Sequence, residues 1–232
     1  VYRNWFASEF RAHMPEDVVS FTNVCIWNPT ETKTNIERLT EFLKPSHKLK
    51  FFIINIEALS TEKGKNYLQR LLNLTKSFFC IDESTNIKNR TARRTKACMK
   101  LGKLATYRRI LTGTPVTQGP LDLWSQMHFL DEFILQSSFY AYRNTFCVIQ
   151  RRRTSSHSFD EVVGYQRLDE LQKILDEHSF RVTKEECLDL PPKLRQIRHI
   201  DMTPAQKRMY VILKKRAILE LEREKLVTAP LI

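Results

Sequence analysis

Short apolar runs alternate with longer amphipathic stretches over roughly the first half of the chain. Four runs of strand length are bounded by polar or turn residues: Asn23–Trp27, Phe51–Ile56, Phe78–Ile81 and Arg109–Leu111. Between them, apolar residues recur at helical spacing in Ile36–Leu43, Tyr67–Leu74 and Thr91–Ala105. Short apolar strands separated by helices of about 10–15 residues are typical of buried parallel sheets. The pattern therefore predicts an α/β fold with a parallel sheet sandwiched by helices.

The pattern becomes predominantly helical after residue 120. Helical spacing recurs in three segments: Leu121–Phe133, Phe139–Phe146 and Leu168–His178. We interpret the polar stretch Arg151–Asp160, with its cluster Arg151-Arg152-Arg153, as a loop that either contacts DNA or is merely solvated. Further on, Thr203-Pro204-Ala205-Gln206 is a capping-box pattern with proline at the first helical position. It predicts a long helix that ends near Leu226.

The overall composition is that of a folded globular protein, with 42% hydrophobic and 28% charged residues in a chain of 232. This length fits one large domain or one domain with part of another, and the composition excludes a mainly disordered chain. The apolar runs are far shorter than the roughly 20 residues that span a bilayer, so we expect no membrane segment. Five cysteines stand far apart without a Cys-x-x-Cys pair, which indicates reduced, intracellular thiols and no zinc site.

Net charge is the unusual property of the composition. Lysine and arginine number 38 against 26 aspartates and glutamates, so the net charge is +12. This excess favours a polyanionic partner, with nucleic acid as the first hypothesis. Between Asn86 and Arg109 the chain has no acid and nine basic residues: Lys88, Arg90, Arg93, Arg94, Lys96, Lys100, Lys103, Arg108 and Arg109.

A basic helix face within this stretch is a candidate DNA-binding surface. Its members recur at helical spacing: Arg93, Lys96, Lys100 and Lys103. Such a face would contact DNA phosphates without reading the base sequence, although a merely solvated face explains a charge run equally well. We add the neighbouring Lys88 and Asn89 to the candidate set.

Two acids, Asp82 and Glu83, directly follow the apolar run Phe78–Ile81. A buried strand that ends in this way places both carboxylates at its carboxyl edge, where ligands bind in open α/β sheets. Hydrolysis of a nucleoside triphosphate needs a carboxylate to hold Mg²⁺, usually through water, and a group that activates the attacking water. Asp82 and Glu83 fit those roles respectively. The alternative is that the two acids only solubilise a strand end.

A second strand ends in the polar turn Thr112-Gly113-Thr114-Pro115. The glycine permits close approach of another backbone, and two hydroxyl groups flank it. Alone, this turn is equally well explained as an ordinary strand exit with threonine caps.

Together, the two turns resemble motifs of Swi/Snf-like DNA translocases, which belong to superfamily two of the helicases. Asp82-Glu83-Ser84-Thr85-Asn86-Ile87-Lys88-Asn89 is similar to their Asp-Glu-Ala-His-x-Ile/Leu-Lys-Asn motif. Thr112–Pro115, followed by Leu121–Trp124, resembles their third motif and the helix after it. Further similar segments occur in the same order as in the family: Val1–Trp5, Asn55–Glu57, Phe180–Lys184, Leu190–Lys193 and Thr203–Gln206 with Tyr210.

The resemblance implies a RecA-like P-loop NTPase lobe of a DNA-dependent ATPase that uses ATP and Mg²⁺ to move along duplex DNA. Residues 1–187 would form a partial first lobe with a helical extension from about 120, and residues 188–232 the connector and the start of a second lobe. By residue matching, Asp82 would position Mg²⁺, Glu83 would activate water, and Thr112, Gly113, Thr114 and Pro115 would couple nucleotide state to the DNA surface. The protein would be nuclear in a eukaryote and cytoplasmic in a bacterium or phage.

The chain departs from the family pattern in several places. No Gly-x-x-x-x-Gly-Lys-Ser/Thr occurs in it, so we expect a lobe truncated at its N-terminal part that alone hydrolyses ATP negligibly. Ser84-Thr85 replaces Ala-His, and Val182 replaces an arginine. These departures leave two hypotheses open: a motor, or a non-catalytic nucleic-acid-binding module that kept the fold.

Overall fold

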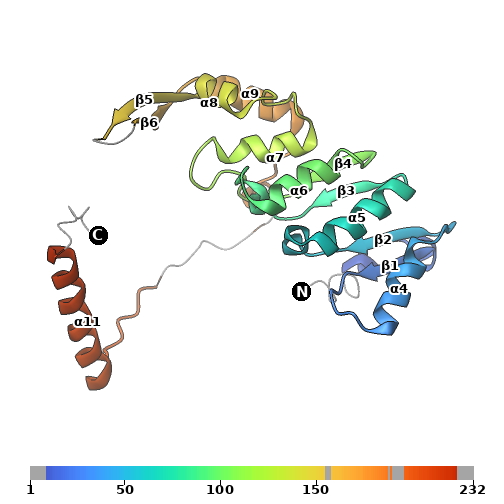
Figure 1. Cartoon of the computed structure of the whole chain (residues 1–232), viewed down its shortest axis with the longest axis horizontal. Helices are drawn as coiled ribbons and strands as arrows, with labels where there is room; N and C mark the ends of the chain where they lie inside the picture. The colour runs from blue at the N-terminus through green and yellow to red at the C-terminus, as the bar shows by residue number, and fades with distance from the viewer. Residues whose placement is uncertain (1–8, 155–157, 188, 190–195, 224–232) are drawn as a thin grey trace. The chain divides into compact units, whose positions relative to one another are not determined.

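The structure is a computed structural model that describes residues 9–154, 158–187, 189 and 196–223 (Figure 1). It divides into two compact units, Val1–Phe180 and Arg181–Ile232, which we describe separately. The segments Val1–Trp5 and Leu190–Lys193, which carry part of the resemblance, lie outside the described residues. No helix in the described part of the chain is long and apolar enough to cross a membrane. The domain boundary after residue 187 stays a prediction.

The first parallel strand pair consists of β1 (Thr22–Ile26) and β2 (Leu49–Ile53). The crossover between them contains α4 (Lys33–Leu43), whose start is capped by Thr32. The Thr32 hydroxyl accepts a hydrogen bond from the amide of Asn35 at 3.3 Å, which satisfies one of the free N–H groups of the first helical turn. The bounds of both strands and of the helix lie within three residues of those expected from the sequence.

The second parallel pair consists of β3 (Phe78–Ile81) and β4 (Tyr107–Ile110), connected through η3 (Ser84–Ile87) and α6 (Arg93–Gly102). The bounds of β3 are those predicted from its apolar run. The remaining elements of this region precede β1 or connect β2 to β3: α2 (Arg11–His13), α3 (Glu16–Ser20), η2 (Ile56–Ser60) and α5 (Glu62–Leu74).

One hydrophobic core joins the two strand pairs. It contains Cys25 of β1, Trp27 directly after that strand, Ile81 of β3, and buried residues of α5 and α6. In the described residues, the strands form two separate two-stranded parallel sheets instead of one continuous sheet. The expected parallel pairing is therefore confirmed, and side-chain packing connects the two sheets.

A second hydrophobic core lies in the helical part of the same unit. It is formed by α7 (Asp122–Leu130), α8 (Phe139–Phe146) and α9 (Leu168–His178), with Tyr142 and Phe146 almost fully buried. Figure 1 shows α7 between the strand region and the α8–α9 layer. The helix contributes Phe129 to the first core and Trp124 to the second, so it holds the two parts together.

An antiparallel hairpin replaces the loop that we expected at Arg151–Asp160. Its strands are β5 (Cys147–Arg153) and β6 (Ser158–Tyr165), and Arg151, Arg152 and Arg153 all lie in β5. The expectation was wrong because the hairpin has polar residues on both faces over most of its length, so the apolar alternation that reveals a half-buried strand is weak.

The second unit contains α10 (Lys184–Cys187) and α11 (Pro204–Arg223). The predicted capping box is confirmed at the start of α11. The Thr203 amide donates to Oε1 of Gln206 at 3.0 Å, and the Gln206 amide donates to the Thr203 hydroxyl at 3.3 Å. The predicted end of this helix, near Leu226, lies outside the described residues.

Candidate functional site

The ends of β3 and β4 bring the two polar turns together. Ile81 pairs with Ile110, and beyond this pair the Leu111 amide donates to the Ile81 carbonyl at 2.9 Å. The Ser84 amide then donates to the Leu111 carbonyl at 2.9 Å. Asp82 and Glu83 therefore lie beside the start of the Thr112–Pro115 turn, as expected for parallel neighbouring strands.

Glu83 turns the chain away from β3 in a left-handed conformation, with φ 50° and ψ 59°. A non-glycine residue adopts this conformation rarely, and such strained residues cluster at functional sites. Oδ1 of Asp82 accepts a hydrogen bond from the Glu83 amide at 2.9 Å, and the Glu83 carbonyl accepts from the Asn86 amide at 2.9 Å. The side chains of both acids remain exposed. The turn thus directs two carboxylates into solvent at the sheet edge.

The Thr112–Pro115 turn is stabilised locally and open on its glycine side. The Thr112 hydroxyl accepts a hydrogen bond from the Thr114 amide at 3.1 Å. A Cβ built on Gly113 would meet no atom within 4 Å, so no described group approaches this glycine closely. The predicted close approach at Gly113 stays a prediction.

Asp122, at the start of α7, anchors the chain just beyond this turn. Its Oδ2 accepts hydrogen bonds from the Thr117 amide at 2.9 Å, the Thr117 hydroxyl at 2.7 Å and the Gln118 amide at 2.8 Å. Burial alone would raise the pKa of the Asp122 carboxyl, but these hydrogen bonds and nearby Lys88 together lower it. The carboxylate therefore stays charged and holds the loop against α7.

The candidate DNA-binding residues fall into two groups. Three of them form side-chain contacts within the chain: Nζ of Lys88 donates to the Thr117 hydroxyl, Oδ1 of Asn89 accepts from Thr91, and Lys103 pairs with Glu132. The other three are exposed on α6, and in the described part of the chain they make no ion pair: Arg93, Lys96 and Lys100. The candidate face on α6 thus combines three exposed basic side chains with Lys103, whose charge is paired with Glu132, and its contact with DNA stays a prediction.

A buried polar network behind the acids was not anticipated from the sequence. The Ser84 hydroxyl donates to Oε1 of Gln126 at 2.6 Å, and both residues are almost fully buried. The hydroxyl of Ser125, also buried, donates to the Lys88 carbonyl at 2.6 Å. The one signal in the sequence was the replacement of the family's alanine by Ser84, a polar residue next to an apolar strand.

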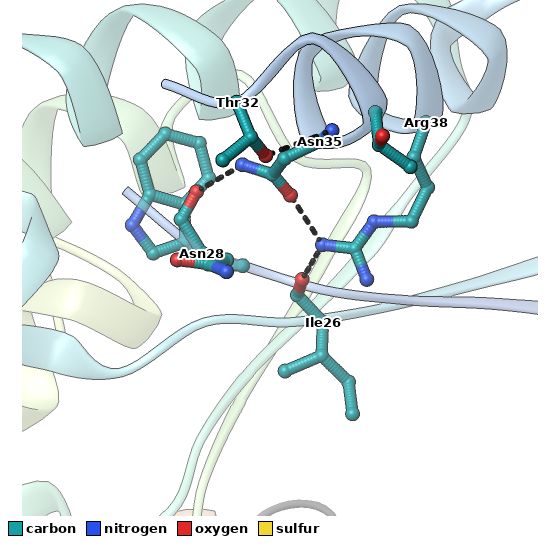
Figure 2. A pocket seen from close by; sticks show the side chains of 7 residues that line it. Ile26, Asn28, Thr32, Asn35 and Arg38 are labelled. Carbon is teal, nitrogen blue, oxygen red and sulfur yellow. Dashed lines mark hydrogen bonds between the residues drawn. The ribbon is translucent and has the colours of Figure 1, made fainter. Parts of the chain in front are cut away.

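A cavity of about 490 Å³ lies at the end of β1 and the start of α4 (Figure 2). Its polar lining is tied together internally. Asn35 donates to the carbonyls of Asn28 and Thr30 at 2.8 and 2.7 Å, and Arg38 donates to the Ile26 carbonyl at 2.7 Å and to Asn35 at 2.9 Å. None of its lining residues belongs to the two polar turns. The hydrogen bonds of Asn35 and Arg38 stabilise the connection between β1 and α4, and this structural role accounts for the polar lining.

Comparison with known proteins assigns the chain to a family. A protein-family model described as the SNF2-related domain matches residues 1–229. The chain belongs to this family. Among its relatives, TATA-binding protein-associated factor 172 of Homo sapiens is 30% identical over 173 residues, which is 74% of this chain and 9% of that protein. TATA-binding protein-associated factor MOT1 of Saccharomyces cerevisiae is 32% identical over 149 residues, which is 63% of this chain and 8% of that protein.

A solved structure of the SWI2/SNF2 ATPase core of Sulfolobus solfataricus in complex with double-stranded DNA is 22% identical. The match covers 92% of this chain and 46% of the solved chain, with a TM-score of 0.48. The SNF2-related chain thus spans less than a tenth of the two curated relatives and under half of the solved one. The family model and the curated relatives confirm the resemblance to Swi/Snf-like, superfamily-two ATPases. The two parallel strand pairs with their helices confirm the α/β class.

Proposed function

We propose that this chain provides the sheet edge with the hydrolytic residues of a DNA-dependent ATPase that moves along duplex DNA. The observation that carries the proposal is the adjacency of Asp82-Glu83 and the Thr112–Pro115 turn at one edge of the β3–β4 pair. A water-activating group and a turn that responds to it must lie side by side if hydrolysis is to drive movement. Membership in the SNF2-related family supports the ATPase class.

The carboxylates fit Mg²⁺ and ATP chemistry. In the described residues, no group of three His, Cys, Asp or Glu side chains could enclose a metal ion. Mg²⁺ bound to nucleotides suits this arrangement, because it keeps several waters and uses one or two carboxylates plus phosphate oxygens. Asp82 would hold the ion through water, and the hydrogen bond from the Glu83 amide to its Oδ1 orients the carboxylate. The bound ion would neutralise charge that develops on the phosphates.

Glu83 would accept the proton of the attacking water. Its carboxylate is exposed and is held by a turn whose conformation is set by the Asn86 and Ser84 amides. A general base of this kind contributes about 10²–10⁴ in rate. The phosphate-binding loop and the second lobe would be provided by sequence other than these 232 residues, which contain no Gly-x-x-x-x-Gly-Lys-Ser/Thr.

The partner proposed for α6 is the phosphate backbone of duplex DNA. Arg93, Lys96 and Lys100 are exposed on one helix that follows the Asp82-Glu83 turn, so DNA bound there would lie near the nucleotide. The names of relatives include "DNA repair protein RAD5" and "DNA annealing helicase and endonuclease ZRANB3", which is consistent with action on DNA. In a eukaryotic source this function would place the protein in the nucleus.

The test is ATP hydrolysis by the full-length protein without nucleic acid, with single strands and with duplex. We expect duplex to stimulate turnover, and Glu83→Gln to lower kcat by about 100-fold or more while duplex binding persists. Glu177→Gln, an exposed carboxylate of α9, is the matched control and should retain wild-type kcat. Hydrolysis that no nucleic acid stimulates would refute the translocase.

The competing function is a non-catalytic nucleic-acid-binding module. It would bind duplex without turnover in the full-length protein, and Glu83→Gln would then change nothing measurable. We expect the 232-residue chain alone to hydrolyse ATP negligibly in either case. Robust turnover by that chain, abolished by Glu83→Gln, would show that it needs no further parts.

A further inference from the structure

Gln126 is a buried amide that contacts both polar turns of the candidate site. It lies in α7, and only 1% of its surface is exposed. Its Nε2 donates to the Pro115 carbonyl at 2.8 Å and to the Asp122 carbonyl at 2.8 Å. Its Oε1 accepts from the hydroxyl of Ser84, 42 positions away in the sequence, at 2.6 Å.

The orientation of this amide is determined by its neighbours. Two carbonyl oxygens can only accept, so the NH₂ group must face Pro115 and Asp122, and the amide oxygen must face Ser84. The Ser84 hydroxyl in turn has to donate. A fully satisfied buried polar network of this kind is rigid, and loss of one member leaves the others unpaired.

Through its hydrogen bond with Ser84, the side-chain amide of Gln126 is connected to the strained turn at Glu83. The Ser84 amide is held by the Leu111 carbonyl, and its side chain is held by Gln126, so both ends of this residue are fixed directly after Glu83. Pro115 closes the Thr-Gly-Thr-Pro turn on the other side. A shift of that turn at Pro115 would therefore move Gln126 and, with it, the backbone that orients the Glu83 carboxylate.

We propose that Gln126 is a positioning residue that links the Thr112–Pro115 turn to Glu83. The proposal rests on the proposed hydrolytic function of Glu83. Three other side-chain contacts join the same segments in the described part of the chain: Lys88 with Asp122 at 3.9 Å, Lys88 with the Thr117 hydroxyl, and Ser125 with the Lys88 carbonyl at 2.6 Å. All three act on Lys88, directly after η3. Of the side-chain contacts, that of Gln126 acts next to the carboxylate, where it adds to the backbone hydrogen bond between Ser84 and Leu111.

Gln126→Leu in the full-length protein tests the link, because leucine keeps the volume and removes all three hydrogen bonds. Assays at temperatures well below the melting temperature of each variant separate positioning from folding. We expect kcat to fall about tenfold, the scale of losing a buried hydrogen bond, while KM for ATP and duplex affinity stay within about twofold. Gln172→Leu, an exposed glutamine of α9, is the matched control and should change none of these.

Gln126→Glu gives a readout that loss of packing would not produce. A protonated carboxyl can donate to the Pro115 carbonyl and accept from Ser84, whereas a buried carboxylate cannot donate. Burial also raises the pKa of such a carboxyl. We therefore expect this variant to retain kcat at low pH and to lose it as pH rises, in a step that wild type lacks. Ser84→Ala with Gln126→Leu should regain thermal stability relative to Gln126→Leu without regaining kcat.

Hydrogen exchange of the backbone amides at 83–87 and 112–118 completes the experiment. Faster exchange in both segments of Gln126→Leu, and in neither segment of the control, is expected. A kcat within twofold of wild type in a folded Gln126→Leu, or an effect confined to KM, would overturn the positioning role. If the wild-type protein has no ATP turnover, the proposed hydrolytic function is refuted. In that case the hydrogen-exchange measurement still tests the link, because unchanged amide exchange in Gln126→Leu would refute it.

Discussion

The conformation of Glu83 shows how a site residue depends on groups that are distant in sequence. Alone, a glutamate prefers to avoid φ 50°, because its Cβ crowds the following carbonyl. The surrounding hydrogen bonds hold it there: Asp82 accepts from its amide, Asn86 donates to its carbonyl, and Ser84 is fixed by Leu111 and Gln126. The strain is therefore maintained by the packed structure, and the carboxylate direction is a property of the fold.

Gly64 is required by a close backbone contact between α5 and η2. A Cβ at this position would lie 2.3 Å from the Ala58 carbonyl oxygen, and backbone cannot rotate away as a side chain can. We expect Gly64→Ala to lower the free energy of unfolding by about 1–3 kcal/mol, as overpacked core substitutions do. Gly113→Ala is the control, because the space beside Gly113 is open. Urea unfolding of both variants checks the prediction, and equal stabilities would contradict it.

His128 connects stability to pH. It stacks on Trp124, with ring centroids 4.5 Å apart, and burial lowers its pKa, with a further lowering by Lys103 and opposing effects of Glu132 and Asp131. Since the unfolded pKa is about 6.5 and the folded one is lower, the unfolded chain takes up the proton first as pH falls. The contribution of neutral His128 is thus complete above about pH 6.5 and is lost as pH falls through the folded pKa.

Replacement of His128 should flatten this dependence. We expect wild type to lose more unfolding free energy between pH 7.5 and 5.5 than His128→Gln, measured by urea titration at each pH. His178→Gln, at an exposed position of α9, should keep the wild-type slope. Identical slopes for wild type and His128→Gln would show that another group causes the acid sensitivity.

At the scale of elements, the two faces of α6 differ sharply in environment. Its inner face buries Thr95, Cys98 and Leu101, and its outer face carries the exposed basic residues. Burial raises the pKa of the Cys98 thiol to about 12, although Arg94 and a backbone hydrogen bond lower it. A thiol with this pKa is almost entirely protonated at neutral pH, and the thiolate is the reactive form.

Alkylation should therefore distinguish buried from exposed thiols. With iodoacetamide at pH 8, we expect Cys187, which is exposed, to react within minutes and Cys98 to stay unmodified until the chain unfolds. Peptide mass spectrometry with and without urea locates the labels. Rapid labelling of Cys98 in the folded protein would mean that α6 separates from the core.

Elements were predictable where one local pattern decides them. The bounds of β3, α8 and α9 follow directly from apolar runs and helical periodicity, since each buries one side against a core. The β5–β6 hairpin was missed because Arg151, Arg152 and Arg153 break the alternation. The pairing of Ser84 with Gln126 was missed for another reason: the two residues are 42 positions apart, and no local pattern links them, so only the fold brings them together.

At the scale of the whole molecule, α7 joins the parts that the sequence describes separately. It contributes to both hydrophobic cores, and its remaining face carries Gln126, which contacts Pro115 and Ser84, and Asp122, which holds the loop at Thr117 and Gln118. The motifs in the sequence predict a role for the two acids. The helix packed behind them is found only from its contacts in the structure.

The distribution of charge leads to a prediction about DNA binding. A net charge of +12 attracts any polyanion, so affinity alone does not identify a binding face. We compare two triple variants with the same charge change. One is Arg93→Glu, Lys96→Glu and Lys100→Glu on α6. The other is Lys33→Glu, Lys48→Glu and Lys173→Glu at exposed positions elsewhere in the same unit.

If the α6 face contacts phosphates, the first triple should lower duplex affinity strongly, and the slope of log affinity against log salt should become shallower by about 0.9 for each lost contact. The second triple changes the long-range field equally but removes no contact, so its slope should stay close to wild type. Fluorescence anisotropy with a labelled duplex at several salt concentrations measures both. Equal losses of affinity and slope in the two triples would mean that the chain binds DNA through its overall charge, and the α6 face would then be a solvated surface.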